Sequence, residues 1–473
     1  MGLLSSIKSG LSHFGHKVAA EIIEETPAIV KRAVDATAFV MATPSAIANL
    51  INPDIVPRLD HALQTVKIPL KPTIVAATDA LLIPAFLNRP PLSKTDAGVS
   101  PARTGNQITT LVDGVAYKTA LIDQINDPNN KSIWIQAYEW QDSSSANDVA
   151  DALIAVKTKA KAEGRDLDVR VLFDNRASSG ELVQKTSRSL KEPPKMDDMR
   201  AAGIDVRRTD YAGMRVNHRK ISVFNGEKAF IGGQNIGNNY MLDASWTYHD
   251  VTQIISGPSA SDAAKVFADS WYRAGGAKLA LLPPAPAQTG AGIGAKVQVI
   301  SHSGGMDRNI QSELIDQIGK EKSEVILMNG FGMSDAIARA LKSASARGVK
   351  VTWIWGEAAH LPSLMAQIKF DELRSAGVEI RHYPTPLHIK AAYFRGNDAI
   401  MQGSSNLDGF STFLNDEVVV QITGGGVPAE FYSQVIAPDL AKSPVLTTST
   451  VVAPKSTLED VKTKTAERVI DGD

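Results

Sequence analysis

The sequence contains no cysteine among its 473 residues. This absence excludes disulfides and thiol chemistry, but it leaves the cellular compartment open, because secreted and cytosolic proteins can both lack cysteine. The chain also lacks an excess of charge of either sign, since charged residues make up 21% and the formal net charge is -1. Such a balance provides no overall attraction to nucleic acid or to an anionic membrane.

Long apolar runs are missing as well. No uninterrupted run reaches the roughly 18 residues that suggest a spanning helix, and the nearest candidate, residues 74–87, is interrupted by Asp79 and Pro84. The N-terminus lacks the basic, apolar and small-residue order of a cleavable signal peptide, so any export is expected to use another route. With 43% apolar residues, the chain has the composition of a globular protein with a substantial core.

Residues 1–100 differ in character from the rest of the chain. Apolar residues recur every three or four positions near the N-terminus, which predicts an amphipathic helix. Such a helix could pack on the rest of the protein or lie in a membrane interface; Lys8 and Lys17 favour the interface, whereas nearby glutamates do not supply a basic face. We expect a helical extension with a membrane or partner contact, joined by a linker at residues 88–105.

From residue 107 onward the chain repeats itself. A predicted strand, a helix that ends at a glycine and a second strand occupy residues 132–174, and the same order recurs over residues 323–356. Strands that alternate with helices favour parallel sheets covered on both faces. The sequence therefore predicts an α/β protein with two similar lobes, each a mostly parallel sheet flanked by helices. The predicted bounds are 101–275 for lobe 1, 276–440 for lobe 2 and 441–473 for a polar C-terminal tail.

Each copy carries a histidine and a lysine two positions apart, followed by two small residues and an asparagine. The first set is His218, Lys220, Gly232, Gly233 and Asn235, and the second is His388, Lys390, Gly403, Ser404 and Asn406. Residues i and i+2 of a strand point to the same face, so each histidine projects together with its lysine. A single pair of this kind would most often be a solvated strand end. Two pairs at matched places in a repeat indicate one shared site.

These motifs resemble the phospholipase D superfamily, whose signature is His-x-Lys in each of two lobes. The resemblance is strongest to the cardiolipin synthase and phosphatidyltransferase branch, and it covers roughly residues 107–425. Residues 217–240 resemble the first motif of this branch and residues 387–418 resemble the second. The two N-terminal spanning helices common in bacterial cardiolipin synthases are missing here. The resemblance implies the phospholipase D fold.

The resemblance also implies a two-step displacement at phosphorus through a covalent phosphohistidine. By analogy with the family, His218 is the nucleophile and His388 is the general acid and base, an order that the sequence alone does not determine. Lys220, Lys390 and the amides of Asn235 and Asn406 would hold the phosphoryl oxygens. No metal or other cofactor is expected, because two lysines neutralise the phosphate.

An acceptor must orient each imidazole, and the positions that match the family are Asp250 and Glu417. The sequence departs from the family at the seventh residue after each histidine, where Asn225 and Arg395 replace the usual aspartate. We interpret that aspartate as a supporting carboxylate, so its loss could lower activity or alter the charge of the site. Glu227 and Asp398, in the adjacent turns, are the candidates to replace it.

Further residues are expected near the phosphate. Gly233, Ser404 and Arg215 are predicted to take part in substrate binding. Arg215 belongs to an arginine cluster. By default such a cluster is a solvated face of the protein, but next to a phosphate site its side chains could instead attract an anionic headgroup. The other members of this cluster are Arg207, Arg208 and Arg219. Aromatic residues on the strand patterns, namely Trp134, Tyr138, Trp140, Trp353 and Trp355, are expected in the core rather than in ligand stacking.

The leading interpretation is an enzyme that hydrolyses or transfers phosphatidyl groups of phospholipids, with the membrane as its substrate surface. One alternative is a nuclease of the same superfamily, against which the net charge argues, so no nucleic-acid partner is expected. Another is a non-catalytic lipid-binding member, given weight by Asn225 and Arg395. A single chain should suffice because it carries both motifs. We expect the protein either to associate peripherally with a membrane or to be delivered as a bacterial effector by a secretion system. In the second case the secretion system would be a partner.

Overall fold

The computed structural model describes residues 98–178, 192–211, 215–356 and 366–447, apart from 245, 282, 289–293, 305–306 and 367–368. The helical extension predicted for residues 1–100 lies almost entirely outside these residues, as does most of the predicted polar tail. Within this described part, no helix is long and apolar enough to cross a membrane.

Lobe 1 contains a seven-stranded sheet in the order β1-β7-β6-β5-β2-β3-β4. Its strands are β1 (Gln107–Val112), β2 (Ser132–Ala137), β3 (Asp168–Asp174), β4 (Asp205–Thr209), β5 (Ile221–Phe224), β6 (Lys228–Gly232) and β7 (Val251–Ser256). Its helices are α6 (Asp113–Ile125), α7 (Ser144–Ala162), α8 (Asn175–Ser178), α9 (Met196–Ala201), α10 (Asn238–Met241) and α11 (Ala260–Arg273).

Lobe 2 repeats this arrangement with the strand order β11-β10-β9-β12-β13-β14-β8. Its strands are β8 (Lys296–His302), β9 (Glu324–Asn329), β10 (Lys350–Trp355), β11 (Glu379–His382), β12 (Lys390–Phe394), β13 (Ala399–Gly403) and β14 (Glu417–Thr423). Its helices are α12 (Asn309–Lys320), α13 (Asp335–Ala346), α15 (Phe370–Ser375), α16 (Val427–Phe431) and α17 (Ala437–Lys442), with π-helical segments η3 (Phe410–Leu414) and η4 (Tyr432–Ile436). The predicted α/β fold with two similar lobes is confirmed.

Both sheets are mixed, and this refines the expectation of mostly parallel sheets. Parallel pairing joins only β2, β3 and β4 in lobe 1 and β9, β10 and β11 in lobe 2. The other neighbouring strands pair antiparallel. The reason is the connection between strands: the helices that follow β2 and β3 allow a parallel return, whereas the short turn between β5 and β6 forces a hairpin.

Local sequence signals explain where the helices end. The Ser334 hydroxyl accepts a hydrogen bond from the backbone N–H of Ile337 and so caps the start of α13. Beyond the last turns of α7 and α13, Gly164 and Gly348 adopt φ values of 68° and 86°. Only glycine reaches this left-handed conformation without a steric penalty, so each glycine stops its helix and turns the chain toward the next strand.

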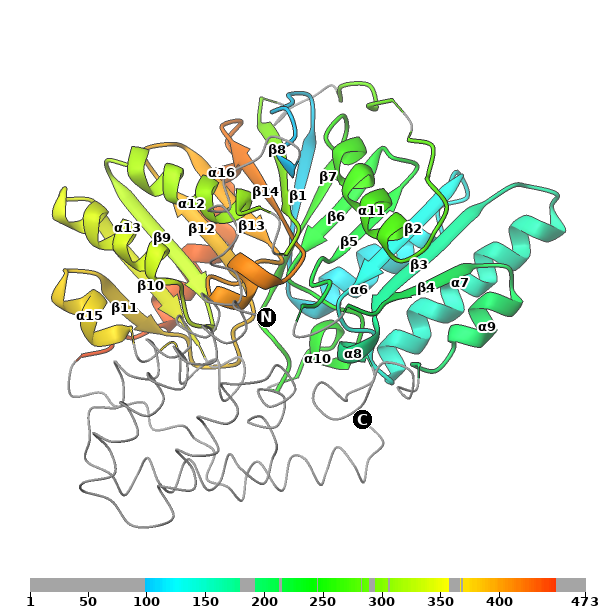
Figure 1. Cartoon of the computed structure of the whole chain (residues 1–473), viewed down its shortest axis with the longest axis horizontal. Helices are drawn as coiled ribbons and strands as arrows, with labels where there is room; N and C mark the ends of the chain where they lie inside the picture. The colour runs from blue at the N-terminus through cyan, green and yellow to red at the C-terminus, as the bar shows by residue number, and fades with distance from the viewer. Residues whose placement is uncertain are drawn as a thin grey trace, which may run out of the picture. The chain divides into compact units, whose positions relative to one another are not determined.

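The lobes share one apolar core. Phe267 and Trp271 of α11 belong to a buried cluster that also contains Val418 of β14 and Phe431 of α16. Separate clusters lie beneath the outer helices, with α7 and α9 on lobe 1 and α12, α13 and α15 on lobe 2 (Figure 1). The four tryptophans predicted to be core residues are all buried, and they are Trp134, Trp140, Trp353 and Trp355.

Parts of the predicted linker and of the predicted C-terminal tail pair with strands. In the predicted linker, the backbone N–H groups of Ser100 and Arg103 donate to Val299 and Val297 of β8, each at 2.9 Å. In the tail, Val445 forms a bridge with Arg381 of β11. These pairings correct the linker prediction for residues 98–103, because the outer side of an edge strand offers unpaired backbone groups that such a segment can satisfy.

Candidate active site

The two His-x-Lys pairs lie where β5 and β12 begin, as the sequence predicts. Each imidazole is bound to a carboxylate of the other lobe. Nδ1 of His218 lies 2.8 Å from Oε1 of Glu417 at the start of β14, and Nδ1 of His388 lies 2.6 Å from Oδ2 of Asp250 just before β7. All four side chains are buried. Because each Nδ1 faces a carboxylate, the Nε2 atom of each ring is left for chemistry.

The two lysines of the motifs are also buried. Lys220 donates from Nζ to the carbonyl of His218 at 2.9 Å and lies 4.8 Å from the centre of the Tyr138 ring. Lys390 donates to the carbonyl of His388 and lies 5.5 Å from the Phe331 ring. Burial, which disfavours the charged form, lowers the pKa of Lys220 to about 7 and that of Lys390 to about 8. A bound anion would restore their charge.

Burial also shifts the pKa values of the imidazole–carboxylate pairs. It raises the pKa of Asp250 and of Glu417 to about 7, although nearby lysines oppose the shift. Burial, followed by the charges of Lys220 and Lys390, lowers the pKa of both His218 and His388 well below the usual value. In each pair, these shifts favour a proton on the carboxylate over one on the imidazole until an anion binds.

The small residues after β6 and β13 support the carboxylates. A Cβ added to Gly233 would lie 2.4 Å from Oδ1 of Asp250, so only glycine lets this carboxylate approach. The hydroxyl of Ser404 donates to Oε2 of Glu417. The backbone N–H groups of Gly233 and Ser404 donate to Val251 and Val418 in the sheets. These contacts engage both N–H groups and the Ser404 hydroxyl within the protein, and the predicted role of Gly233 and Ser404 in substrate binding stays a prediction.

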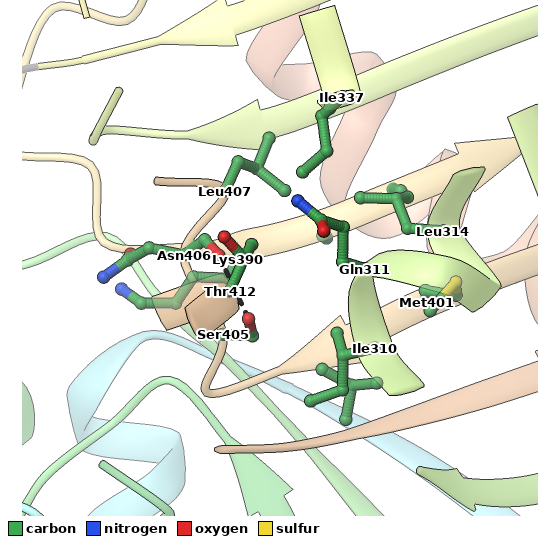
Figure 2. A pocket seen from close by; sticks show the side chains of 13 residues that line it. Ile310, Gln311, Leu314, Ile337, Lys390, Met401, Ser405, Asn406, Leu407 and Thr412 are labelled. Carbon is green, nitrogen blue, oxygen red and sulfur yellow. Dashed lines mark hydrogen bonds between the residues drawn. The ribbon is translucent and has the colours of Figure 1, made fainter. Parts of the chain in front are cut away.

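The two asparagines of the motifs are buried. Oδ1 of Asn235 accepts a hydrogen bond of 3.1 Å from the backbone N–H of Glu139. Figure 2 shows Asn406 and Lys390 extending in the same direction, away from the apolar side chains around a cavity of about 30 Å³. That volume has room for a single water rather than for a substrate. The role of the amides in phosphate binding stays a prediction.

Aromatic side chains surround the histidines, an arrangement that the sequence did not predict. The ring of Tyr138 lies 4.5 Å from that of His218, although Tyr138 was predicted to be a core residue. Tyr240 and Tyr248 lie 5.2 and 5.0 Å from the ring of His388. The hydroxyl of Tyr240 donates to Oε2 of Glu139 at 3.0 Å. The sequence contained one signal that Tyr138 and Glu139 lie near the site. Both residues directly follow β2, which pairs with β5, the strand after the first motif.

The arginine cluster does not converge on the histidines. Arg219 is 1% exposed, and its guanidinium donates to the carbonyl of His302 and to the hydroxyl of Ser270. Arg208 pairs with Glu192 at 3.0 Å, and Arg207 donates to the carbonyl of Gly275. The interpretation of a common surface for an anionic headgroup is therefore wrong for these three residues, since successive residues on an extended chain point in different directions.

Arg215, the fourth member of the cluster, forms an ion pair with the buried carboxylate of Asp416, at 2.5 Å between Nη2 and Oδ1. Asp416 immediately precedes Glu417, so Arg215 reaches the segment that carries one of the orienting acids. Its predicted role in substrate binding stays a prediction.

Asn225, which replaces the usual aspartate, acts at the turn after β5. It adopts φ 56°, and its Oδ1 accepts hydrogen bonds from the backbone N–H groups of Lys131 and Ser132 at 2.7 and 3.1 Å. An aspartate could accept the same two bonds, so the asparagine retains the function. Asn225 lies five positions, roughly 16 Å along an extended strand, beyond Lys220. The exchange therefore leaves the charge of the site unchanged.

Lobe 2 obtains the same acceptor from another residue. Oε1 of Glu321 accepts hydrogen bonds from the backbone N–H groups of Ser323 and Gly396, at 2.6 and 2.9 Å. This carboxylate occupies the place of the missing aspartate, and Arg395 turns outward to Glu324. The hypothesis that Glu227 and Asp398 replace the aspartates near the lysines is wrong, because both side chains are exposed in the turns at the far ends of the hairpins.

A metal centre is a further possibility for a site rich in histidine and carboxylate. Among the described residues, no group of three or more histidine, aspartate or glutamate side chains is arranged to hold a metal ion.

Comparisons with known proteins place this arrangement in a family. Residues 121–271 and 314–436, more than half of the chain, match the family described as "Cardiolipin synthase, PLD-like domain". Cardiolipin synthase A of Buchnera aphidicola subsp. Acyrthosiphon pisum (strain Tuc7) is 27% identical over 310 residues, which are 62% of this chain and 61% of that protein. Cardiolipin synthase A of Pseudomonas aeruginosa (strain LESB58) is 30% identical over 237 residues, 48% of this chain and 47% of that protein.

A solved structure shows the same fold. Phosphatidylserine synthase of Haemophilus influenzae Rd KW20 superposes with a TM-score of 0.58 at 14% identity, covering 77% of this chain and 93% of that chain. The chain thus has the phospholipase D fold, and it spans 61% or less of the length of the two cardiolipin synthases named above. With the family match over both lobes, the chain belongs to the family of cardiolipin synthase PLD-like domains.

Proposed function

We propose that the protein transfers or hydrolyses phosphatidyl groups of phospholipids through a covalent phosphohistidine. The observation that carries this proposal is the crossed pairing of His218 with Glu417 and of His388 with Asp250, at 2.8 and 2.6 Å. It gives each lobe one oriented imidazole, and two imidazoles are what a two-step displacement at phosphorus requires. The names of the related cardiolipin synthases support phospholipids as the substrate class.

In the first step, Nε2 of His218 attacks phosphorus and the bond to the leaving alkoxide breaks. His388 gives the alkoxide a proton from its Nε2, and the carboxylate of Asp250 stabilises the imidazolium through Nδ1. The raised pKa of Asp250 means that the His388–Asp250 pair holds an available proton near neutrality. The negative phosphate draws that proton onto the imidazole, where the leaving group needs it.

In the second step, His388 removes a proton from water or from an alcohol, and the oxygen attacks the phosphohistidine. The bond between phosphorus and His218 breaks, and the free histidine is restored. Water gives hydrolysis, whereas a second alcohol gives transfer. Lys220 and Lys390 neutralise the charge that develops on the phosphoryl oxygens, with Asn235 and Asn406 as further donors.

The test is turnover of defined substrates by the intact protein. Vesicles of phosphatidylglycerol or phosphatidylethanolamine, and separately DNA, are incubated with the protein. We expect lipid products, either phosphatidic acid from hydrolysis or a new phosphodiester from transfer, and none from DNA. His218→Ala should abolish turnover, whereas His382→Ala, which alters a histidine on the edge strand β11, should not.

Turnover that survives His218→Ala would overturn the mechanism. Products from DNA alone would favour a nuclease, and no turnover on any lipid would favour the lipid-binding alternative. A membrane surface as substrate, function as a single chain and delivery by a secretion system stay predictions.

A further inference from the structure

The residue before each orienting acid makes the same two backbone hydrogen bonds to the opposite lobe. The N–H of His249 donates to Pro386, and the carbonyl of His249 accepts from the N–H of His388, both at 2.9 Å. Asp416 repeats this pattern: its N–H donates to Val216 at 3.0 Å and its carbonyl accepts from His218 at 2.9 Å. Each histidine of the site is therefore held by its backbone as well as by its ring.

The side chain of His249 adds an ionic link between the lobes. Its Nδ1 lies 2.6 Å from Oδ1 of Asp113 in lobe 1, and its Nε2 lies 2.8 Å from Oδ2 of Asp439 on α17 of lobe 2. A ring with a carboxylate at both nitrogens donates from both, so it is an imidazolium. It also stacks on Tyr383 of lobe 2, with ring centres 4.8 Å apart. Burial opposes this charge, but the hydrogen bonds to the two carboxylates outweigh it and raise the pKa of His249 to about 9.

Asp416 makes the matching link with the opposite charge. Its carboxylate is fully buried, and Oδ1 accepts from Arg215 of lobe 1 at 2.5 Å and from the N–H of Gly304 at 2.8 Å. Oδ2 lies 3.5 Å from Nη1 of Arg273 on α11 of lobe 1. Each link thus places a cation of lobe 1, His249 or Arg215, against a carboxylate of lobe 2, Asp439 or Asp416.

We propose that His249 and Asp416 are positioning residues, which form two reciprocal clamps that hold the active histidine of the opposite lobe against its orienting acid. The His249 clamp holds His388 to Asp250, and the Asp416 clamp holds His218 to Glu417. Neighbours along the chain cannot move independently, so a clamp on one residue fixes the acid beside it. As far as catalysis is concerned, this inference rests on the proposed function.

Hydrogen exchange at single backbone amides tests the clamps without any turnover. In His249→Gln, which cannot carry charge, we expect exchange at the His388 amide to accelerate by about tenfold or more while the His218 amide is unchanged. Asp416→Asn should produce the reverse pattern. The milder variant Asp439→Asn should give the pattern of His249→Gln, and Arg273→Gln should give the pattern of Asp416→Asn. These two variants replace the first pair in the test if the first pair fails to fold.

The matched control is an ion pair within lobe 1, on a segment whose backbone pairs with lobe 2. Arg103, which pairs with β8 of lobe 2, binds Asp262 of α11 at 2.7 Å, and this link touches neither histidine segment. Asp262→Asn should leave both amides protected. Acceleration of both amides in every variant, or of neither, would overturn the clamp proposal.

Kinetics then separates the clamps from the proposed function. Loss of a clamp should reduce kcat by about 10²-fold with little change in KM, because the phosphate-binding lysines stay in place while the acid and imidazole lose alignment. If the wild-type protein turns over no phospholipid, the proposed function fails while the exchange pattern still decides the clamps. An unchanged kcat in variants whose exchange pattern has changed would show that the clamps do not serve catalysis.

Discussion

Nδ1 of His218 lies 2.8 Å from Oε1 of Glu417, a residue 199 positions further along the chain and in the other lobe. The second pair, His388 and Asp250, crosses the lobes in the reverse direction. Neither His218 nor His388 is therefore oriented by a carboxylate of its own lobe. The lobes must associate before the proposed chemistry can occur, and their shared apolar core provides that association.

The crossed pairs predict that the two acids affect different steps. Glu417→Gln should impair attack by His218, and Asp250→Asn should impair proton donation by His388, each reducing kcat by about 10²- to 10⁴-fold. A substrate with an acidic phenol as leaving group needs no proton donor. On that substrate the first step should recover in Asp250→Asn and stay slow in Glu417→Gln, as a burst experiment would reveal. Equal recovery in both variants would contradict the assignment of the two histidines.

The pKa shifts predict a narrow optimum of kcat/KM near neutrality. Glu417 takes up a proton as the pH falls below about 7, and then no longer accepts a hydrogen bond as a carboxylate from the nucleophile His218. Lys220 and Lys390 lose protons as the pH rises above about 7 and about 8, and then no longer neutralise the phosphate. Activity should decline on both sides, and Lys220→Arg should move the start of the alkaline decline upward, because Lys220 has the lower pKa and arginine stays charged. A flat profile from acid to alkaline pH would contradict this account.

The replacement of the usual aspartate by Asn225 is predicted to have little effect on activity or stability. Asn225→Asp retains the acceptor for Lys131 and Ser132, so activity and stability should change by no more than about twofold and about 0.5 kcal/mol. Glu321→Ala removes the equivalent acceptor in lobe 2 and should reduce the free energy of unfolding by about 1–3 kcal/mol. Urea denaturation and lipid turnover measure both effects. A large gain of activity in Asn225→Asp would show that the position does influence the site.

Arg219 is predicted to stabilise the contact between the lobes. Arg219→Met leaves the carbonyl of His302 and the hydroxyl of Ser270 without their buried donor, which should cost about 3–5 kcal/mol. Arg395→Met is the control, because Arg395 is exposed and its ion pair with Glu324 is worth at most about 1 kcal/mol. Equal stability of the two variants in urea would contradict a structural role for Arg219.

The sequence by itself determined the repeat, the two lobes and the paired motifs. Spacing along the chain is enough to predict that helices end at Gly164 and Gly348. It also predicts that polar residues stand at the starts of β5 and β12. Local spacing is visible without a structure because it reflects backbone conformation within a few residues. The mixed character of the sheets was less visible, since a short turn and a helical crossover both follow strands of similar composition.

Only the tertiary structure decided which acid orients which histidine, what replaces the missing aspartate in lobe 2, and which arginine is buried. Glu417, Glu321 and Arg219 each act on groups brought close by the packing of distant segments. The sequence suggested that Asn225 threatened catalysis, but its contacts show a turn residue that supports the start of β2. Contacts of this kind depend on the association of two sheets through a shared core, and no periodicity along the chain encodes them.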